Sequence, residues 1–162
     1  MQFLSKILVL AALCLSPRLA AAQEEIIGDN ELNQAVTWTF DLIQKDAKTY
    51  ELQAHAEIKA GFHLWSVDPG GDGTLIPTDI TLADEAIKWQ GAWKESIAPQ
   101  VRSYDFIEGA VRYFDSSVTF SRTLTGLAPN ATLSGSVDFQ TCNEQMCFPP
   151  ETIDFTVRAK KL

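Results

Sequence analysis

The chain has few cysteines, histidines and basic residues, and each shortage excludes a class of protein. Its 162 residues include 3 cysteines and 2 histidines, and 21 acidic residues outnumber 13 basic ones for a formal net charge of −8. Because so acidic a surface repels phosphate, we expect no nucleic-acid partner. Metal sites need three or four donors close together, so we expect neither a metal nor another cofactor.

Long hydrophobic runs are missing as well, except at the N-terminus. There, Lys6 precedes an apolar run over residues 7–15 and the small residues Ala20, Ala21 and Ala22, which is the pattern of an export signal. We therefore predict a signal peptide over residues 1–22, cleaved near Ala22, and a single domain over residues 23–162. No later segment approaches the roughly 18 apolar residues of a membrane span, so we expect none after signal removal.

The rest of the chain is dominated by alternation of apolar and polar residues, which is typical of half-buried strands. The clearest alternation covers residues 36–42 and 50–59, and shorter segments of strand composition follow at intervals of about ten residues. An Asp-, Pro- and Gly-rich stretch over residues 68–73 is expected to end the extended segment before it. Because the helical period is largely absent, we predict an all-β, two-sheet antiparallel sandwich of about seven to nine strands.

Four bulky or titratable residues receive no site in this interpretation. Trp89 and Trp93 flank Gly91, and we expect them in a loop where they anchor the core. His55 falls on the polar side of its strand, and His63 points away from its apolar neighbours in an extended segment. We assign neither histidine to a site.

The informative feature is a pair of cysteines, Cys142 and Cys147, separated by four residues. If they flank a hairpin loop, their Cα atoms lie roughly 4.5 to 5.5 Å apart, which suits a disulfide in an oxidising compartment. Spacing alone leaves open a structural bridge, a redox pair or a metal site. A bridge over so short a loop contributes only about 2 kcal/mol of chain entropy, and only Met146 offers a metal donor nearby.

Three segments together resemble the N-terminal periplasmic domain of the DsbD thiol:disulfide interchange protein family. They are residues 61–66, residues 104–109, and the cysteine pair followed by Phe-Pro-Pro-Glu-Thr over residues 148–152. The resemblance implies an immunoglobulin-like fold, a periplasmic location and a redox-active disulfide that carries reducing equivalents, as in a thiol:disulfide oxidoreductase. Cys147 matches the cysteine that forms the mixed disulfide with a partner, and Cys142 matches the one that resolves it.

The same resemblance implies a cap loop and a set of partners. Asp105, Phe106 and Gly109 resemble the family's cap, an aromatic flap that covers the disulfide until a partner displaces it. The implied partners are thioredoxin-like periplasmic proteins and a membrane electron transporter. The chain ends at Leu162 without the transmembrane and thioredoxin-like domains of the full-length family protein, so we expect the transporter to act in trans.

A function of a different class stays open on the residues alone. In this alternative the sandwich is a non-catalytic module that binds a protein or a glycan, and Cys142 and Cys147 form a permanent structural disulfide. Its candidate contact residues are Trp65, Trp89 and Trp93.

Overall fold

The computed structural model describes residues 35–105 and 107–161, so the predicted signal peptide and Phe106 lie outside the described residues. The described residues form eleven strands and no helix, and therefore no helix long and apolar enough to span a bilayer. The strands are β1 (Val36–Gln44), β2 (Thr49–Ile58), β3 (His63–Gly70), β4 (Asp79–Leu82), β5 (Lys88–Glu95), β6 (Gln100–Tyr104), β7 (Ile107–Phe114), β8 (Val118–Thr125), β9 (Thr132–Phe139), β10 (Thr141–Cys142) and β11 (Glu151–Lys161).

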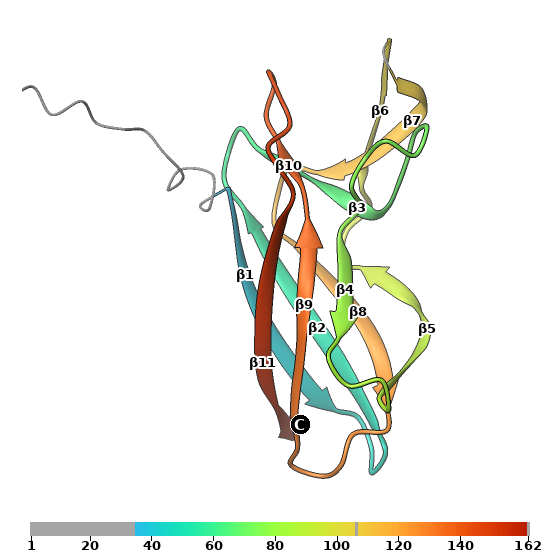
Figure 1. Ribbon diagram of the computed structural model, residues 1–162, viewed down its shortest axis with the longest axis vertical. Helices are drawn as coiled ribbons and strands as arrows, with labels where there is room; N and C mark the ends of the chain where they lie inside the picture. The colour runs from blue at the N-terminus through green and yellow to red at the C-terminus, as the bar shows by residue number, and fades with distance from the viewer. Residues whose placement is uncertain (1–34, 106, 162) are drawn as a thin grey trace, which may run out of the picture.

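These strands make the two sheets of a sandwich (Figure 1). The larger sheet has the order β4-β9-β11-β1-β2-β8-β5, and the smaller one has the order β10-β3-β7-β6. The predicted all-β, two-sheet architecture is confirmed, with more strands than the seven to nine expected. Pairing is antiparallel except that β1 and β11, the first and last described strands, run parallel. A parallel pair needs a long connection, and almost the whole domain lies between these two strands.

Strand β2 shows why the sequence folds in this way. Its alternate residues Tyr50, Leu52, Ala54 and Ala56 are buried, while the residues between them are at least partly exposed. The strand therefore presents one apolar face to the core and one polar face to solvent, as its period predicts. The turn before it is closed by Asp46, whose carboxylate accepts hydrogen bonds from the backbone amides two and three residues later at 2.8 and 2.9 Å.

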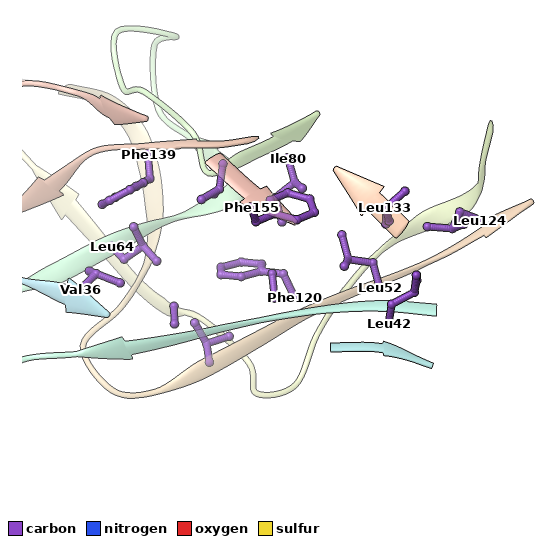
Figure 2. Packing of buried hydrophobic residues seen from close by; sticks show 14 of the residues in the cluster. Val36, Leu42, Leu52, Leu64, Ile80, Phe120, Leu124, Leu133, Phe139 and Phe155 are labelled. Carbon is purple, nitrogen blue, oxygen red and sulfur yellow. The ribbon is translucent and has the colours of Figure 1, made fainter. Parts of the chain in front are cut away.

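The main core lies between the two sheets (Figure 2). Aromatic rings pack against one another within it: Phe114 and Phe120 meet edge to face with centroids 5.8 Å apart, and Phe40 stacks on Phe155 at 4.3 Å. Leu64 of β3 and Phe114 of β7 bring the smaller sheet into this core. Burial of these side chains supplies the main driving force for folding.

The smaller sheet is also apolar on its other face. Trp65, Val111 and Cys142 are buried there in a second cluster, which half-buried residues of β6, β7 and the segment after β3 extend. Because side chains alternate between the two faces of a strand, Leu64 points into the main core and its neighbour Trp65 points into the second cluster. This second cluster, away from the main core, contains one of the two paired cysteines.

Two predictions of local structure are wrong. The segment with Trp89 and Trp93 is not a loop but the edge strand β5, whose register shifts between Gln90 and Lys94. Gly91 lies in this bulge with a φ of 70°, and its carbonyl accepts a hydrogen bond from Arg122 at 2.8 Å. The bulge interrupts the alternation of apolar and polar residues, so the sequence pattern did not reveal the strand. Both tryptophans do pack against the main core, as expected.

The expected chain break over residues 68–73 also begins later than predicted. Strand β3 continues to Gly70, which pairs with Val111 across an irregularity in the ladder. Gly70 has a φ of 70°, and a Cβ atom there would lie 2.6 Å from the carbonyl oxygen of Ala110. Arg112 fixes the bulge by an ion pair to Asp68 at 2.7 Å. The following turn is thereby held beside β7, where it forms one wall of the site.

Candidate functional site

Cys142 and Cys147 are joined by a disulfide at the neck of a short hairpin, residues 141–148. The amide of Phe148 donates to the carbonyl of Thr141, and the amide of Asn143 donates to the carbonyl of Met146, both at 2.9 Å. The cysteines sit between these two bonds, so they form a non-hydrogen-bonded pair, the kind whose Cα atoms come closest. Their Cα atoms are 3.9 Å apart, closer than the 4.5 to 5.5 Å expected from the sequence.

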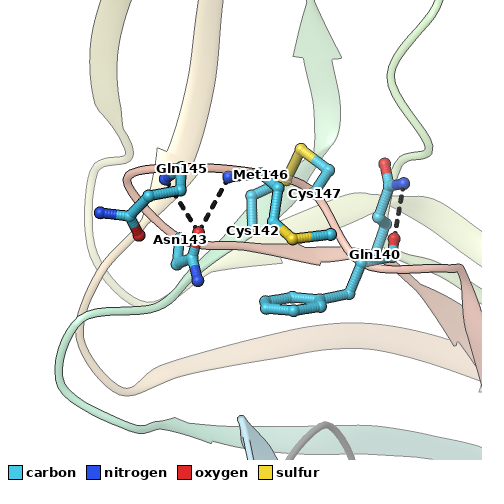
Figure 3. Close-up of a disulfide and its surroundings, with 7 residues drawn as sticks. Gln140, Cys142, Asn143, Gln145, Met146 and Cys147 are labelled. Atoms are coloured by element: carbon cyan, nitrogen blue, oxygen red, sulfur yellow. Dashed lines mark hydrogen bonds between the residues drawn. A yellow bond between two sulfur atoms is a disulfide. The ribbon is translucent and has the colours of Figure 1, made fainter.

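The loop between the cysteines is held by one asparagine side chain (Figure 3). The Oδ1 atom of Asn143 accepts hydrogen bonds from the backbone amides of Gln145 and Met146, both at 2.9 Å. Outside the loop, Gln140 donates from Nε2 to the carbonyl of Phe148 at 2.9 Å. These bonds do not involve the sulfur atoms, so the hairpin has a scaffold that does not depend on the disulfide.

The two sulfur-bearing residues differ sharply in exposure. Cys142 is 1% exposed and packs with Trp65 and Val111, whereas Cys147 is exposed at the surface. A thiolate from another protein is therefore able to approach Cys147 and not Cys142. Because thiol–disulfide exchange begins with attack on one sulfur of the bond, accessibility makes the two cysteines chemically different.

A cavity of about 490 Å³ lies beside the disulfide. Its lining combines the disulfide hairpin, β3, the turn after β3 and the hairpin formed by β6 and β7. In Figure 1, the β10 end and the β6–β7 hairpin stand at the same end of the molecule, opposite the C-terminus. Charged residues of both signs line the cavity: Arg102, Asp72 and Glu144. Hydrogen bonds from Thr74 lower the pKa of Asp72 and keep it ionised.

Two of the predicted cap residues, Asp105 and Gly109, belong to the β6–β7 hairpin. Tyr104 pairs with Ile107, and Asp105 lies in the turn between them. Tyr104 and Ile107 line the cavity, while Asp105 and Gly109 are exposed and are not among its lining residues. Phe106 lies outside the described residues. Gly109 has a φ of 89°, so it supplies the backbone conformation that the hairpin needs.

His63, to which the sequence interpretation gave no site, lines the cavity beside the disulfide. In the ladder between β3 and β10 it is the direct partner of Cys142. Its ring lies 5.1 Å from the ring of Trp65 and 5.0 Å from that of Tyr113. The alternation of β3 places His63 and Trp65 on one face, which the sequence indicated. What it did not reveal is that β10, far along the chain, pairs with β3.

The electrostatic setting of His63 follows from its burial. Burial lowers the pKa of His63 below its ordinary value of 6.5; Glu144 and Asp115 oppose this shift, and Arg102 adds to it. The imidazole is therefore neutral at neutral pH. Arg102, whose guanidinium lies 4.9 Å from the centroid of the Tyr104 ring, was also missed in the sequence, where the only charge noted beside the cysteines was Glu144.

The tryptophans of the binding-module alternative are placed less favourably than that alternative requires. Trp65 is only 2% exposed, so it offers a partner almost no surface. Trp89 and Trp93 are half-buried, with ring centroids 4.9 Å apart and the guanidinium of Arg122 within 6 Å of both rings. The three side chains therefore interact with one another within the fold through ring and cation–π contacts.

Fold and site together define an immunoglobulin-like sandwich that carries one accessible disulfide beside a cavity. The model of the family "Thiol:disulfide interchange protein DsbD, N-terminal" matches residues 30–159, and the chain belongs to this family. The resemblance seen in the sequence is thereby confirmed. No curated protein sequence matches the chain.

Solved structures that share the fold include two N-terminal domains. The N-terminal periplasmic domain of ScsB from Proteus mirabilis superposes with a TM-score of 0.56 at 14% identity, covering 78% of this chain and 46% of that one. The chain thus spans less than half of that relative. The N-terminal domain of DsbD from Neisseria meningitidis, in the reduced form, superposes with a TM-score of 0.50 at 13% identity, covering 75% of this chain and 84% of that one.

Proposed function

We propose that this domain is a periplasmic thiol–disulfide exchange protein whose Cys142–Cys147 pair passes electrons to or from thioredoxin-like proteins. The observation that carries the proposal is the unequal exposure of the two bonded cysteines. The exposed sulfur of Cys147 is the atom that a partner's thiolate can attack. The buried sulfur of Cys142 is shielded from partners and can react only with Cys147 beside it. A disulfide that only stabilises the fold does not require one of its two cysteines to be exposed.

The chemistry balances with the two cysteines alone. When the domain is the reductant, the Cys147 thiolate attacks a partner's disulfide, forms a mixed disulfide and releases one partner thiolate. Cys142 then attacks the sulfur of Cys147, which closes the internal disulfide and releases the second partner thiolate. The domain loses two electrons and the partner gains them. When the domain is reduced by a donor, the same steps run in reverse.

The remaining parts of the proposal concern the surroundings of the site. The mature domain comprises residues 23–162 after removal of the signal peptide, and a membrane electron transporter acting in trans exchanges electrons with it. The β6–β7 hairpin, with Asp105, Phe106 and Gly109, serves as the cap over the disulfide. Support for a cap comes from Tyr104 and Ile107, which line the cavity on both sides of the turn.

Serine variants test the proposed roles of the two cysteines. Cys142→Ser, incubated with an oxidised thioredoxin-like domain, is expected to accumulate a mixed disulfide through Cys147, because the resolving thiol is gone. Cys147→Ser is the matched control and is expected to trap little, since its remaining thiol is buried. Non-reducing electrophoresis and intact mass read out the adduct.

The outcome also decides between the two classes of function. Trapping by neither variant contradicts electron exchange and favours the binding module with a structural disulfide. Trapping mainly through Cys142 contradicts the assignment of roles, because the buried cysteine would then be the one that meets the partner.

A further inference from the structure

The second step of the proposed exchange places a chemical demand on Cys142, and the inference below rests on that proposed function. Cys142 must attack as a thiolate, yet it is 1% exposed and packs among apolar side chains. An apolar, buried setting disfavours the charged thiolate. The carboxylate of Glu144, in the loop between the cysteines, lines the same cavity. Its negative charge further disfavours a negative charge on the sulfur of Cys142. The thiol therefore needs a group that takes its proton.

His63 is placed to be that group. It is the residue directly opposite Cys142 in the antiparallel ladder of β3 and β10, and both residues line the same cavity. Side chains of directly opposed residues project from the same face of a sheet, with Cβ atoms about 4.5 to 5.5 Å apart. The imidazole of His63 and the sulfur of Cys142 are therefore neighbours on one face of the smaller sheet.

The charge state of His63 suits a proton acceptor. The charged groups that act on it come from three elements: Glu144 of the disulfide hairpin, Arg102 of β6, and Asp115 just after β7. Burial outweighs the two carboxylates and holds the imidazole neutral, so one ring nitrogen carries a lone pair. Among the described residues, neither ring nitrogen of His63 makes a hydrogen bond, so that lone pair is not already engaged.

The aromatic neighbours of His63 determine where its ring can lie. Trp65 and Tyr113 contact it from the same strand and from the neighbouring strand β7, at centroid distances of 5.1 and 5.0 Å. These two ring contacts pack the imidazole inside the cavity that Cys142 also lines. A packed side chain that keeps one orientation is what proton transfer in a single encounter requires.

We propose that His63 accepts the proton of the Cys142 thiol during resolution of the mixed disulfide. As the proton moves to the imidazole, the sulfur of Cys142 forms a bond to the sulfur of Cys147, and the bond between Cys147 and the partner's sulfur breaks. The electron pair of that bond leaves on the partner's thiolate, which takes the proton from the imidazolium directly or through water. In the reverse direction the imidazolium returns a proton to Cys142 as its thiolate leaves.

A small aromatic disulfide, 5,5′-dithiobis(2-nitrobenzoic acid), separates the two steps in the full-length mature protein. With the reduced protein in excess, attack by Cys147 releases one coloured thiolate, and resolution by Cys142 releases the second. His63→Gln is expected to slow the second release by about 100-fold or more, since general-base catalysis usually contributes at least that much, and to leave the first unchanged. His55→Gln is the matched control, since His55 lies on β2 and contacts Thr119 and Asp41.

The pH dependence of the second release distinguishes proton transfer by His63 from a purely structural role, because a structural role does not change its shape. In the parent protein, the rate constant of the second release is expected to level off above the pKa of His63. In His63→Gln it is expected to rise about tenfold per pH unit, because only solvent removes the proton. His63→Ala with added imidazole is expected to recover part of the parent rate.

Three results overturn the inference. The first is that His63→Gln releases the second coloured thiolate at the parent rate. The second is that the rate constant of this release in the parent rises tenfold per pH unit without levelling off, a result that can be obtained without any variant. The third is the absence of any second release in the parent, which refutes the proposed function itself. If His63→Gln slows both releases equally, the parent profile and the imidazole experiment decide, since a general defect in folding changes neither.

Discussion

Reduction of the disulfide is expected to cost the domain little stability and to leave its fold intact. The disulfide joins residues only five positions apart in the sequence. The unfolded chain loses little entropy when so short a loop is closed, so the bond contributes about 2 kcal/mol, against about 4.7 kcal/mol for a loop of a hundred residues.

The structure gives two further reasons to expect a small effect. The loop is held by the hydrogen bonds to the side chain of Asn143, and the neck is held by the bond between Phe148 and Thr141; none of these involves sulfur. The main core contains neither cysteine, because Cys142 packs in the second cluster and Cys147 is exposed. Reduction therefore leaves the sandwich packing unchanged.

Urea unfolding of the oxidised and the reduced protein measures the difference. With a slope of about 2 kcal/mol per molar urea, a loss of 2 kcal/mol moves the midpoint by about 1 M. The double variant Cys142→Ala, Cys147→Ala, which has no thiols to reoxidise, should melt near the reduced protein. Unfolding of the reduced protein in buffer at room temperature would refute the reasoning and show that the disulfide is structural.

Two further predictions concern the cap and the titration of the site. Phe106→Ala is expected to speed reduction of the disulfide by dithiothreitol severalfold with little change in its potential, as a less bulky cap exposes the bond; reduction at the parent rate contradicts the cap. Lowering the pH from about 7 to about 5 is expected to destabilise the parent more than His63→Gln. Burial lowers the pKa of His63, so the unfolded chain takes up a proton near pH 6.5, before the folded one does, and stability falls as the pH falls. Urea melts at both pH values measure this, and equal losses in the two proteins contradict it.

The alternation of apolar and polar residues along the chain was enough to predict the sandwich. One face of each strand packs against the core and the other faces solvent, so the two faces differ in composition. Strand β2 illustrates this, because burial follows its apolar positions without exception from Tyr50 to Ala56. The same rule failed at β5, where the bulge around Gly91 changes which face each side chain takes. A bulge depends on the partner strand, and here the register of β8 and the bond from Arg122 to Gly91 specify it.

The site divides in the same way. The sequence by itself was enough to predict a disulfide, because two cysteines separated by four residues and followed by two prolines form a hairpin that brings their sulfurs together. Only the tertiary structure decided which sulfur a partner can reach, since exposure depends on what packs over each residue. It also decided that His63, 79 positions before Cys142 in the sequence, lies opposite it, because the pairing of β3 with β10 is a contact between distant segments that no local pattern encodes.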